Sequence, residues 1–224
     1  MSFDFAAIYR ATRERLTAVL IDLDGASLRD PVPATPLWTV QDVFAHVTGV
    51  ASDVTTGRMD GAVSDEWTQR QVDERKGRSI TEIAAEWSDL GPHVEALLDQ
   101  VGPTMSATAM DVWMHEHGIY GALGTRVYRS GEGLRLCLRA ANAIGPKLDA
   151  AGLPAIRLVT DGYDRSIGSG GPGLTVRGDA FEIARALFGR RSIDQIAAFD
   201  WTGDARPYLS LFSVFESRET DLVE

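Results

Sequence analysis

Residues 35–49 read TPLWTVQDVFAHVTG, and this stretch decides how the first part of the chain folds. Thr39 and Asp42 have the spacing of a capping box, in which two side chains satisfy backbone N–H groups at the start of a helix. The apolar residues that follow recur at helical spacing, and they are Val40, Val43, Phe44, Val47 and Val50. The stretch therefore predicts a helix that begins after Thr39, runs to about Thr56 and ends near Gly57.

Other segments of the first 150 residues show the same helical period. A second capping box, Ser79 with Glu82, starts one of these helices, and Gly102 with Pro103 ends it. The predicted helices cover residues 4–23, 79–101, 106–123 and 134–148, and the segments 24–38 and 57–78 are expected to be loops, the second with one helical turn. Because most of this part is helical with short connections, we predict an up-and-down four-helix bundle.

The pattern changes after about residue 150. Residues 156–164 are rich in branched side chains and predict one strand, and a glycine-rich turn separates them from a second strand at 174–178. Residues 178–189 predict an amphipathic helix, and residues 207–215 predict a closing helix. We therefore expect an α plus α/β protein, with the helical bundle over residues 1–152 and a small α/β domain over residues 153–224.

Composition and charge restrict the classes of partner. The formal charge of the 224-residue chain is −10, which repels phosphate backbones and anionic lipid surfaces, so we expect neither nucleic acid nor membrane as a partner. The first residues lack the basic start and apolar run of a signal peptide, and no stretch has the length of a membrane span. A single cysteine, Cys137, suits a reducing compartment, so we expect a cytoplasmic protein.

The stretch DVWMHEHGIYGALG, residues 111–124, contains the residues that point to a metal. Asp111 and His115 are four apart, so on a helix they present a carboxylate and an imidazole from one face. His117 points to a different face, and His46 is the best third ligand. Two histidines and one carboxylate leave an open position, which is typical of a catalytic zinc site, although nickel or iron also suits these ligands.

Each of these residues also has an ordinary structural interpretation. The Asp-x3-His spacing occurs by chance, in which case the histidines are one core residue and two solvated ones, and we expect His93 on the surface. Asp42 is either a helix cap alone or also a hydrogen-bond partner of His46. Trp38 and Trp113 are expected to pack rather than to line a substrate site, Cys137 is expected to be buried and inert, and Met110 and Met114 are expected to fill the core.

At these residues the chain resembles the mycothiol-dependent maleylpyruvate isomerase family of DinB-like bundles. The resemblance covers the stretches 35–49, 65–87 and 111–124. It also covers residues 178–192, GDAFEIARALFGRRS, followed by WTGD, which resemble the family's C-terminal domain, itself similar to sterol-carrier proteins. The resemblance implies a DinB-like metal-binding bundle followed by a sterol-carrier-like domain, with His46, Asp111 and His115 as the metal ligands.

The resemblance also implies a cofactor and a reaction. It implies that mycothiol meets the metal at its open position and that its thiolate attacks a small electrophilic substrate, in an isomerisation or an S-transfer. Arg190, with its neighbours Arg185 and Arg191, is the candidate for the polar end of the substrate, although a basic helix end explains these arginines equally well. The partners implied are a small-molecule substrate and a low-molecular-weight thiol, for a monomer or a homodimer.

The chain departs from the family's pattern at three positions. Asp111 stands where the family has glutamate, and its side chain is one methylene shorter. Gly118 stands where the family has aspartate, and Tyr120 where it has a polar or basic residue; we expect both to line the same side of the bundle. Two alternatives therefore stay open, namely a binding protein that keeps its metal for structure and a hydrolase that uses metal-bound water.

Overall fold

The computed structural model describes residues 3–224, and the chain divides into two compact units. One unit comprises the residues up to Val127 together with Glu224, and the other comprises Tyr128–Val223. The first unit is mainly helical and the second combines helices with a mixed sheet, so the predicted fold class is confirmed. The division falls earlier than the domain boundary expected at residue 152, because α6 (Glu132–Leu138) packs on a helix of the second unit.

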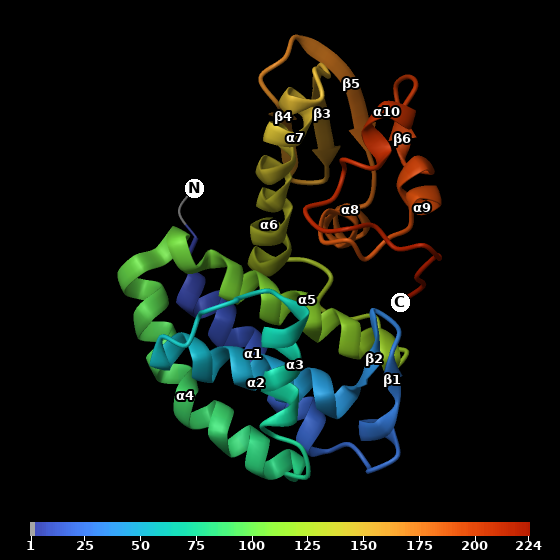
Figure 1. Cartoon of the computed structure of the whole chain (residues 1–224). Helices are drawn as coiled ribbons and strands as arrows, with labels where there is room; N and C mark the ends of the chain where they lie inside the picture. The colour runs from blue at the N-terminus through green and yellow to red at the C-terminus, as the bar shows by residue number, and fades with distance from the viewer. Residues whose placement is uncertain (1–2) are drawn as a thin grey trace. The chain divides into compact units, whose positions relative to one another are not determined.

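Four long helices form the bundle of the first unit (Figure 1). They are α1 (Phe5–Ile21), α2 (Val40–Thr56), α4 (Ile80–Val101) and α5 (Ser106–Ala122), which confirms the predicted helices within two residues at their starts and ends. Both α1 and α2 pack against α4 and α5. Leu16, Phe44 and Trp87 are fully buried between them, so burial of these apolar stripes stabilises the bundle. None of the helices within residues 3–224 has the length and apolar character needed to cross a membrane.

Local signals at the helix ends are present as predicted. The side chain of Thr39 accepts from the backbone N–H of Asp42, whose carboxylate accepts from the backbone N–H of Thr39. Ser79 and Glu82 form the same reciprocal pair at the start of α4. Gly57 ends α2 with a φ of 73°, a left-handed conformation that glycine adopts without steric cost.

The two connections expected to be loops contain more structure than their sequences predict. Residues 24–38 contain the 3-10 turn Ser27–Arg29, and the short strands β1 (Pro31–Val32) and β2 (Thr35–Thr39) pair antiparallel there. Residues 57–78 contain a full helix, α3 (Asp65–Asp73), which packs on α2. The apolar residues of α3 are few, so its helical period is weak in the sequence and its contact with α2 stabilises it.

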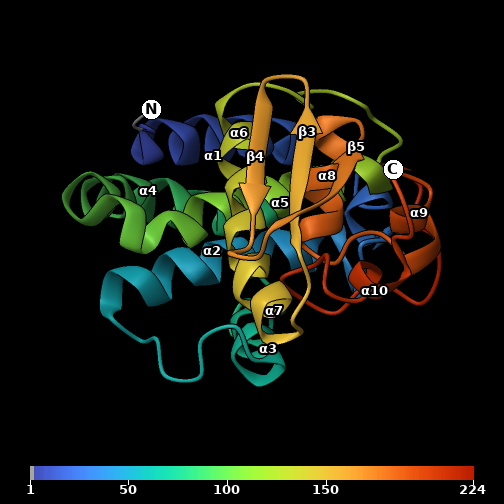
Figure 2. The ribbon, with the colours of Figure 1, turned by 90° about the horizontal axis from the view of Figure 1, so that it is seen from above.

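The second unit contains a four-stranded mixed sheet with the strand order β4-β3-β5-β6. Figure 2 shows β4, β3 and β5 side by side in this order. The single strand predicted over residues 156–164 is wrong. The chain turns at Asp161–Gly162, where Gly162 has a φ of 78°, and β3 (Ala155–Thr160) pairs antiparallel with β4 (Tyr163–Ile167). Strand β5 (Pro172–Arg177) runs parallel to β3, and β6 (Asp200–Trp201) pairs antiparallel with β5.

The helices of the second unit are shorter than expected. The segment 134–148 is not one helix but α6, the 3-10 segment Arg139–Ile144 and α7 (Gly145–Ala150), because Pro146 lacks the N–H that would continue the helix. Helix α8 (Ala180–Leu187) is confirmed, and α9 (Ile193–Ala197) follows it.

The predicted closing helix over residues 207–215 is wrong. Only α10 (Arg206–Leu209) forms there. Beyond α10, the hydroxyl of Ser213 and the backbone N–H of Val214 both donate to the carbonyl oxygen of Leu187, at 3.2 and 2.8 Å. These bonds satisfy the end of α8, so tertiary contacts rather than helical hydrogen bonds decide the path of this segment.

Candidate metal site

Three predicted ligands lie together where α2 and α5 pack side by side in the first unit. His46 comes from α2, and Asp111 and His115 come from α5. Nε2 of His46 is 3.8 Å from Oδ2 of Asp111, and Nε2 of His115 is 3.4 Å from Oδ1 of Asp111. One ligand atom from each residue lies within 4.8 Å of the other two. We refer to these three residues as the triad.

The geometry of the triad fits a divalent metal. Zinc holds nitrogen and oxygen ligands at about 2.0–2.2 Å in a tetrahedron, which separates neighbouring ligand atoms by about 3.3–3.5 Å. The nitrogens of His46 and His115 lie 3.8 and 3.4 Å from different oxygens of Asp111, and one ligand atom from each residue lies within 4.8 Å of the other two, so the side chains must move closer together to hold one ion. Both histidines are buried, whereas 35% of the Asp111 side chain is exposed, which leaves one side accessible to a small ligand.

Gln71 holds His46 from the side away from Asp111, and no motif or spacing in the sequence predicts this contact. Oε1 of Gln71 is 2.8 Å from Nδ1 of His46, and Nε2 of Gln71 donates to Asp53 at 2.8 Å. Asp42, which the sequence offered as a partner for His46, caps α2 instead. Gln71 was missed because it is a neutral amide on α3, 25 residues beyond His46, and α3 itself was expected to be mostly loop.

Trp38 lies against the two imidazoles of the triad. Its ring centroid is 4.9 Å from that of His46 and 6.4 Å from that of His115. Its indole N–H donates to Oε1 of Gln69 at 3.1 Å, and the residue is only partly buried. The expectation of a purely packing residue is therefore incomplete, since Trp38 covers one side of both histidines of the triad.

The other chemically active residues of the stretch 111–124 point elsewhere. His117 is buried against Trp113, with ring centroids 4.1 Å apart, so it is neither solvated nor part of the triad. Trp113 is a core residue as expected, and His93 is exposed as expected. Glu116 is fully buried and accepts two hydrogen bonds of 2.8 Å from Arg15. Burial raises the pKa of the Glu116 carboxyl, and Arg15 and Tyr120 partly offset this effect.

Gly118 and Tyr120 do not line the same side of the bundle. A Cβ atom at Gly118 would lie 3.4 Å from Val32 and 3.5 Å from Ala34, so this position faces the segment that contains β1. The hydroxyl of Tyr120 lies 3.2 Å from Glu116, so it faces the ion pair with α1. These two departures from the family's pattern therefore lie on different faces of α5, Gly118 toward the segment that contains β1 and Tyr120 toward the ion pair with α1.

Arg190 follows α8 in the second compact unit, and its proposed contact with substrate stays a prediction. Its neighbours have structural contacts. Arg185 is fully buried, with its guanidinium 6.0 Å from the ring centroid of Phe181, and buried Arg191 pairs with Glu182 at 2.5 Å. The side chain of Cys137 is buried, as expected.

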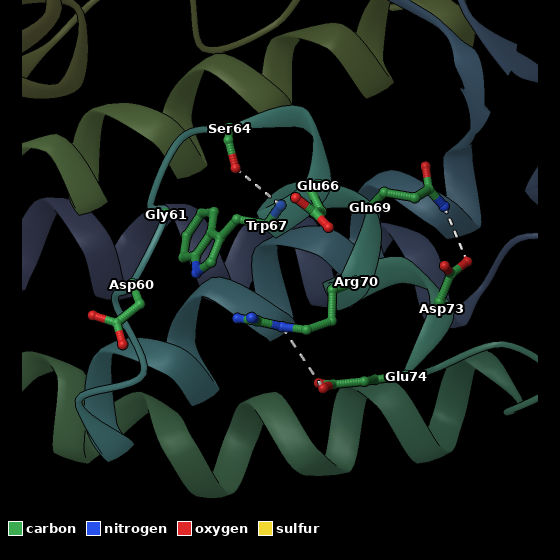
Figure 3. A pocket seen from close by; sticks show the side chains of 9 residues that line it. All are labelled: Asp60, Gly61, Ser64, Glu66, Trp67, Gln69, Arg70, Asp73 and Glu74. Atoms are coloured by element: carbon green, nitrogen blue, oxygen red, sulfur yellow. Dashed lines mark hydrogen bonds and ion pairs between the residues drawn. The ribbon is translucent and has the colours of Figure 1, made fainter.

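A pocket beside α3 is separate from the triad (Figure 3). Its lining is Asp60, Gly61, Ser64, Glu66, Trp67, Gln69, Arg70, Asp73 and Glu74. Four carboxylates and one arginine make this pocket acidic, and it offers no imidazole. Two of its residues are linked to the surroundings of the triad by hydrogen bonds. Gln69 accepts a hydrogen bond from Trp38, and Arg70 donates one to Asp53. The chemistry therefore places the candidate site at the triad rather than in this pocket.

These features define a class of protein, namely a four-helix bundle with a His, Asp and His cluster on two adjacent helices, joined to a mixed-sheet unit. Residues 9–120 match the sequence profile described as Mycothiol maleylpyruvate isomerase N-terminal domain, and the chain belongs to this family. The fold is similar to a solved structure titled as the mycothiol-dependent maleylpyruvate isomerase, with a TM-score of 0.54 and 14% identity over 88% of this chain and 91% of that chain.

A histidine-to-alanine variant of that enzyme matches with the same values. No curated protein sequence is significantly similar to this chain. At this level of identity the two solved structures establish the fold, and the reaction has to be argued from the triad.

Proposed function

We propose that the triad binds a divalent metal, zinc in the first instance, and that the protein uses mycothiol or a related thiol either to isomerise a small electrophile or to transfer the thiol onto it. The observation that supports this proposal best is the proximity of the ligand atoms of His46, Asp111 and His115, all within 4.8 Å of one another. Maleylpyruvate, the substrate named for the similar enzyme, is the first electrophile to test.

The residues of the triad suit a site that accepts a thiol. A bound divalent metal lowers the pKa of a coordinated thiol, so that the nucleophilic thiolate is present at neutral pH. Asp111 supplies one negative charge and the two histidines supply neutral donors, so one positive charge remains to attract a thiolate. The exposed part of Asp111 leaves access for a small molecule, and Trp38 excludes water from one side of both imidazoles.

Arg190 is proposed to bind the anionic end of such a substrate. This proposal rests on its place in the family-like segment 178–192 alone. Arg190→Ala should raise KM for an anionic electrophile and leave kcat for a neutral one unchanged. An equal effect on both substrates would show that Arg190 stabilises the end of α8 instead.

Turnover assays with and without thiol distinguish the proposed reaction from its two alternatives. We expect zinc-loaded protein to convert maleylpyruvate only when thiol is present, or to join mycothiol to a chloro-dinitrobenzene with loss of chloride. Asp111→Asn should abolish this activity, whereas the exposed histidine variant His93→Ala should retain it. Hydrolysis of an ester without thiol would indicate a metal hydrolase, and metal binding without turnover would indicate a binding protein.

A further inference from the structure

A chain of hydrogen bonds runs from the triad to two arginines within the first unit. Nδ1 of His46 lies 2.8 Å from Oε1 of Gln71, and Nε2 of Gln71 donates to Oδ2 of Asp53 at 2.8 Å. Arg58 donates to Oδ1 of Asp53 at 2.7 Å, and Arg70 donates to Oδ2 at 3.0 Å. The side chains of Asp53 and Gln71 are fully buried, so their bonds are shielded from competition by water.

The charge of Asp53 fixes the direction of every bond in this chain. Burial would raise the pKa of Asp53, but hydrogen bonds from Gln71, Arg58 and Arg70 outweigh it and hold the pKa below its ordinary value. The ionised carboxylate only accepts, so the amide nitrogen of Gln71 must face Asp53 and its oxygen must face His46. That oxygen accepts, so the proton of the neutral imidazole is on Nδ1 and the lone pair is on Nε2.

A glycine on α2 allows this contact. Gly49 is buried one turn beyond His46, and a Cβ atom there would lie only 2.4 Å from Cβ of Gln71. Any larger residue at position 49 would push α3 away from α2 and lengthen the bond to His46. Arg75 also holds this residue, because its Nη1 donates to the backbone carbonyl oxygen of Gln71 at 3.0 Å.

We infer that Gln71 and Asp53 are positioning residues, which hold His46 in the tautomer whose Nε2 lone pair faces Asp111 and His115. This inference rests on the proposed function in one respect, because the triad must be the metal site for the tautomer to affect binding. The tautomer itself exists without metal. Residues that hydrogen-bond to the far nitrogen of a histidine ligand orient its ring, and replacing them typically changes metal affinity about 10–100-fold.

Nitrogen NMR of the His46 ring in the metal-free protein tests the tautomer directly. We expect the wild type to show one tautomer, with Nδ1 protonated and Nε2 unprotonated. Gln71→Leu should give a mixture of both tautomers and weaken zinc binding about 10–100-fold in a competition titration. Asp53 keeps Arg58 and Arg70 in this variant, so the protein should stay folded.

The matched control is Gln41→Leu, a second glutamine whose amide donates to the carbonyl oxygen of Arg78 at 2.8 Å. It removes one half-buried amide bond from the same unit, and it should leave the tautomer of His46 and the zinc affinity unchanged. An equal loss of affinity in both glutamine variants would mean a general loss of packing and would overturn the inference.

A pair of charge-exchanging substitutions tests the direction of the bonds. Gln71→Glu alone places two buried carboxylates in contact and should weaken zinc binding. Adding Asp53→Asn restores an amide donor facing a carboxylate acceptor, and that carboxylate still accepts from Nδ1 of His46. The double variant should therefore bind zinc at least about tenfold more tightly than Gln71→Glu alone.

The outcomes separate this inference from the proposed function. A single tautomer and unchanged zinc affinity in Gln71→Leu would overturn the positioning role, even if the wild type binds metal and uses a thiol. If the wild type binds no metal but Gln71→Leu changes the tautomer as expected, the positioning role stands and the proposed function fails.

Discussion

Replacing Arg15 with methionine should destabilise the protein by about 3 kcal/mol, because the change leaves a buried carboxylate without its cation. The side chain of Glu116 is 0% exposed, and both of its oxygens lie 2.8 Å from nitrogens of Arg15. The ion pair joins α1 to α5, the helix that carries Asp111 and His115. This prediction therefore also concerns the rigidity of the helix that supplies two members of the triad.

The magnitude follows from the burial of the two partners. Removing one member of a buried ion pair costs about 3–5 kcal/mol. The side chain of Arg15 is 26% exposed, so water enters part of the space that it leaves, and we expect the lower end of that range. The double variant Arg15→Met with Glu116→Leu should recover most of the loss, because no charge then stays buried without a partner.

Urea unfolding followed by circular dichroism measures this loss. The midpoint of Arg15→Met should fall while the slope with urea stays unchanged, since the surface exposed on unfolding is the same. The matched control is Arg10→Met, because Arg10 is 49% exposed and its partner Glu95 keeps a second arginine, Arg13, at 3.0 Å. We expect a much smaller loss there, because an exposed ion pair contributes little to stability. A loss below about 0.5 kcal/mol in Arg15→Met, or no recovery in the double variant, would refute the reasoning.

Three further predictions concern single residues. Asp53→Asn should lower the free energy of unfolding by about 2 kcal/mol at pH 7. Because the pKa of Asp53 is held low, this difference in stability between wild type and variant should persist above about pH 4 and shrink as the pH falls below it. Urea unfolding of both proteins from about pH 3 to 7 measures the difference. Cobalt bound at the triad should quench the fluorescence of Trp38, whose ring is 4.9 Å from His46, and Trp38→Phe should remove most of that quenching although the other tryptophans remain. Cys137 is buried, so Ellman's reagent should label it only after urea unfolds the protein, and rapid labelling of the native chain would contradict its position.

The long helices were predictable because their signals are local. Thr39 with Asp42 and Ser79 with Glu82 cap the helices that they precede, and the apolar period then follows for several turns. The errors lie where distant contacts decide the structure. The segment after α10 bonds to Leu187, and α3 depends on its packing against α2, and neither contact leaves a periodic pattern in the sequence.

The triad was predictable for a similar reason. Asp111 and His115 are one helical turn apart, so their proximity follows from the spacing alone, and the resemblance to the family supported His46 as their partner. The supporting residues could not be found in this way. Gln71 reaches His46 only because α3 packs against α2, and the position of Trp38 depends on the pairing of β2 with β1, so neither contact follows from helical spacing.

The metal content of the purified protein tests the central claim most directly. Plasma mass spectrometry should find about one zinc or similar ion per chain in the wild type and in His93→Ala, whose histidine is exposed and distant from the triad in sequence. The same measurement should find almost none in His46→Ala. Absence of metal from the wild type, even after addition of zinc, nickel or iron, or equal metal content in His46→Ala, would contradict the account.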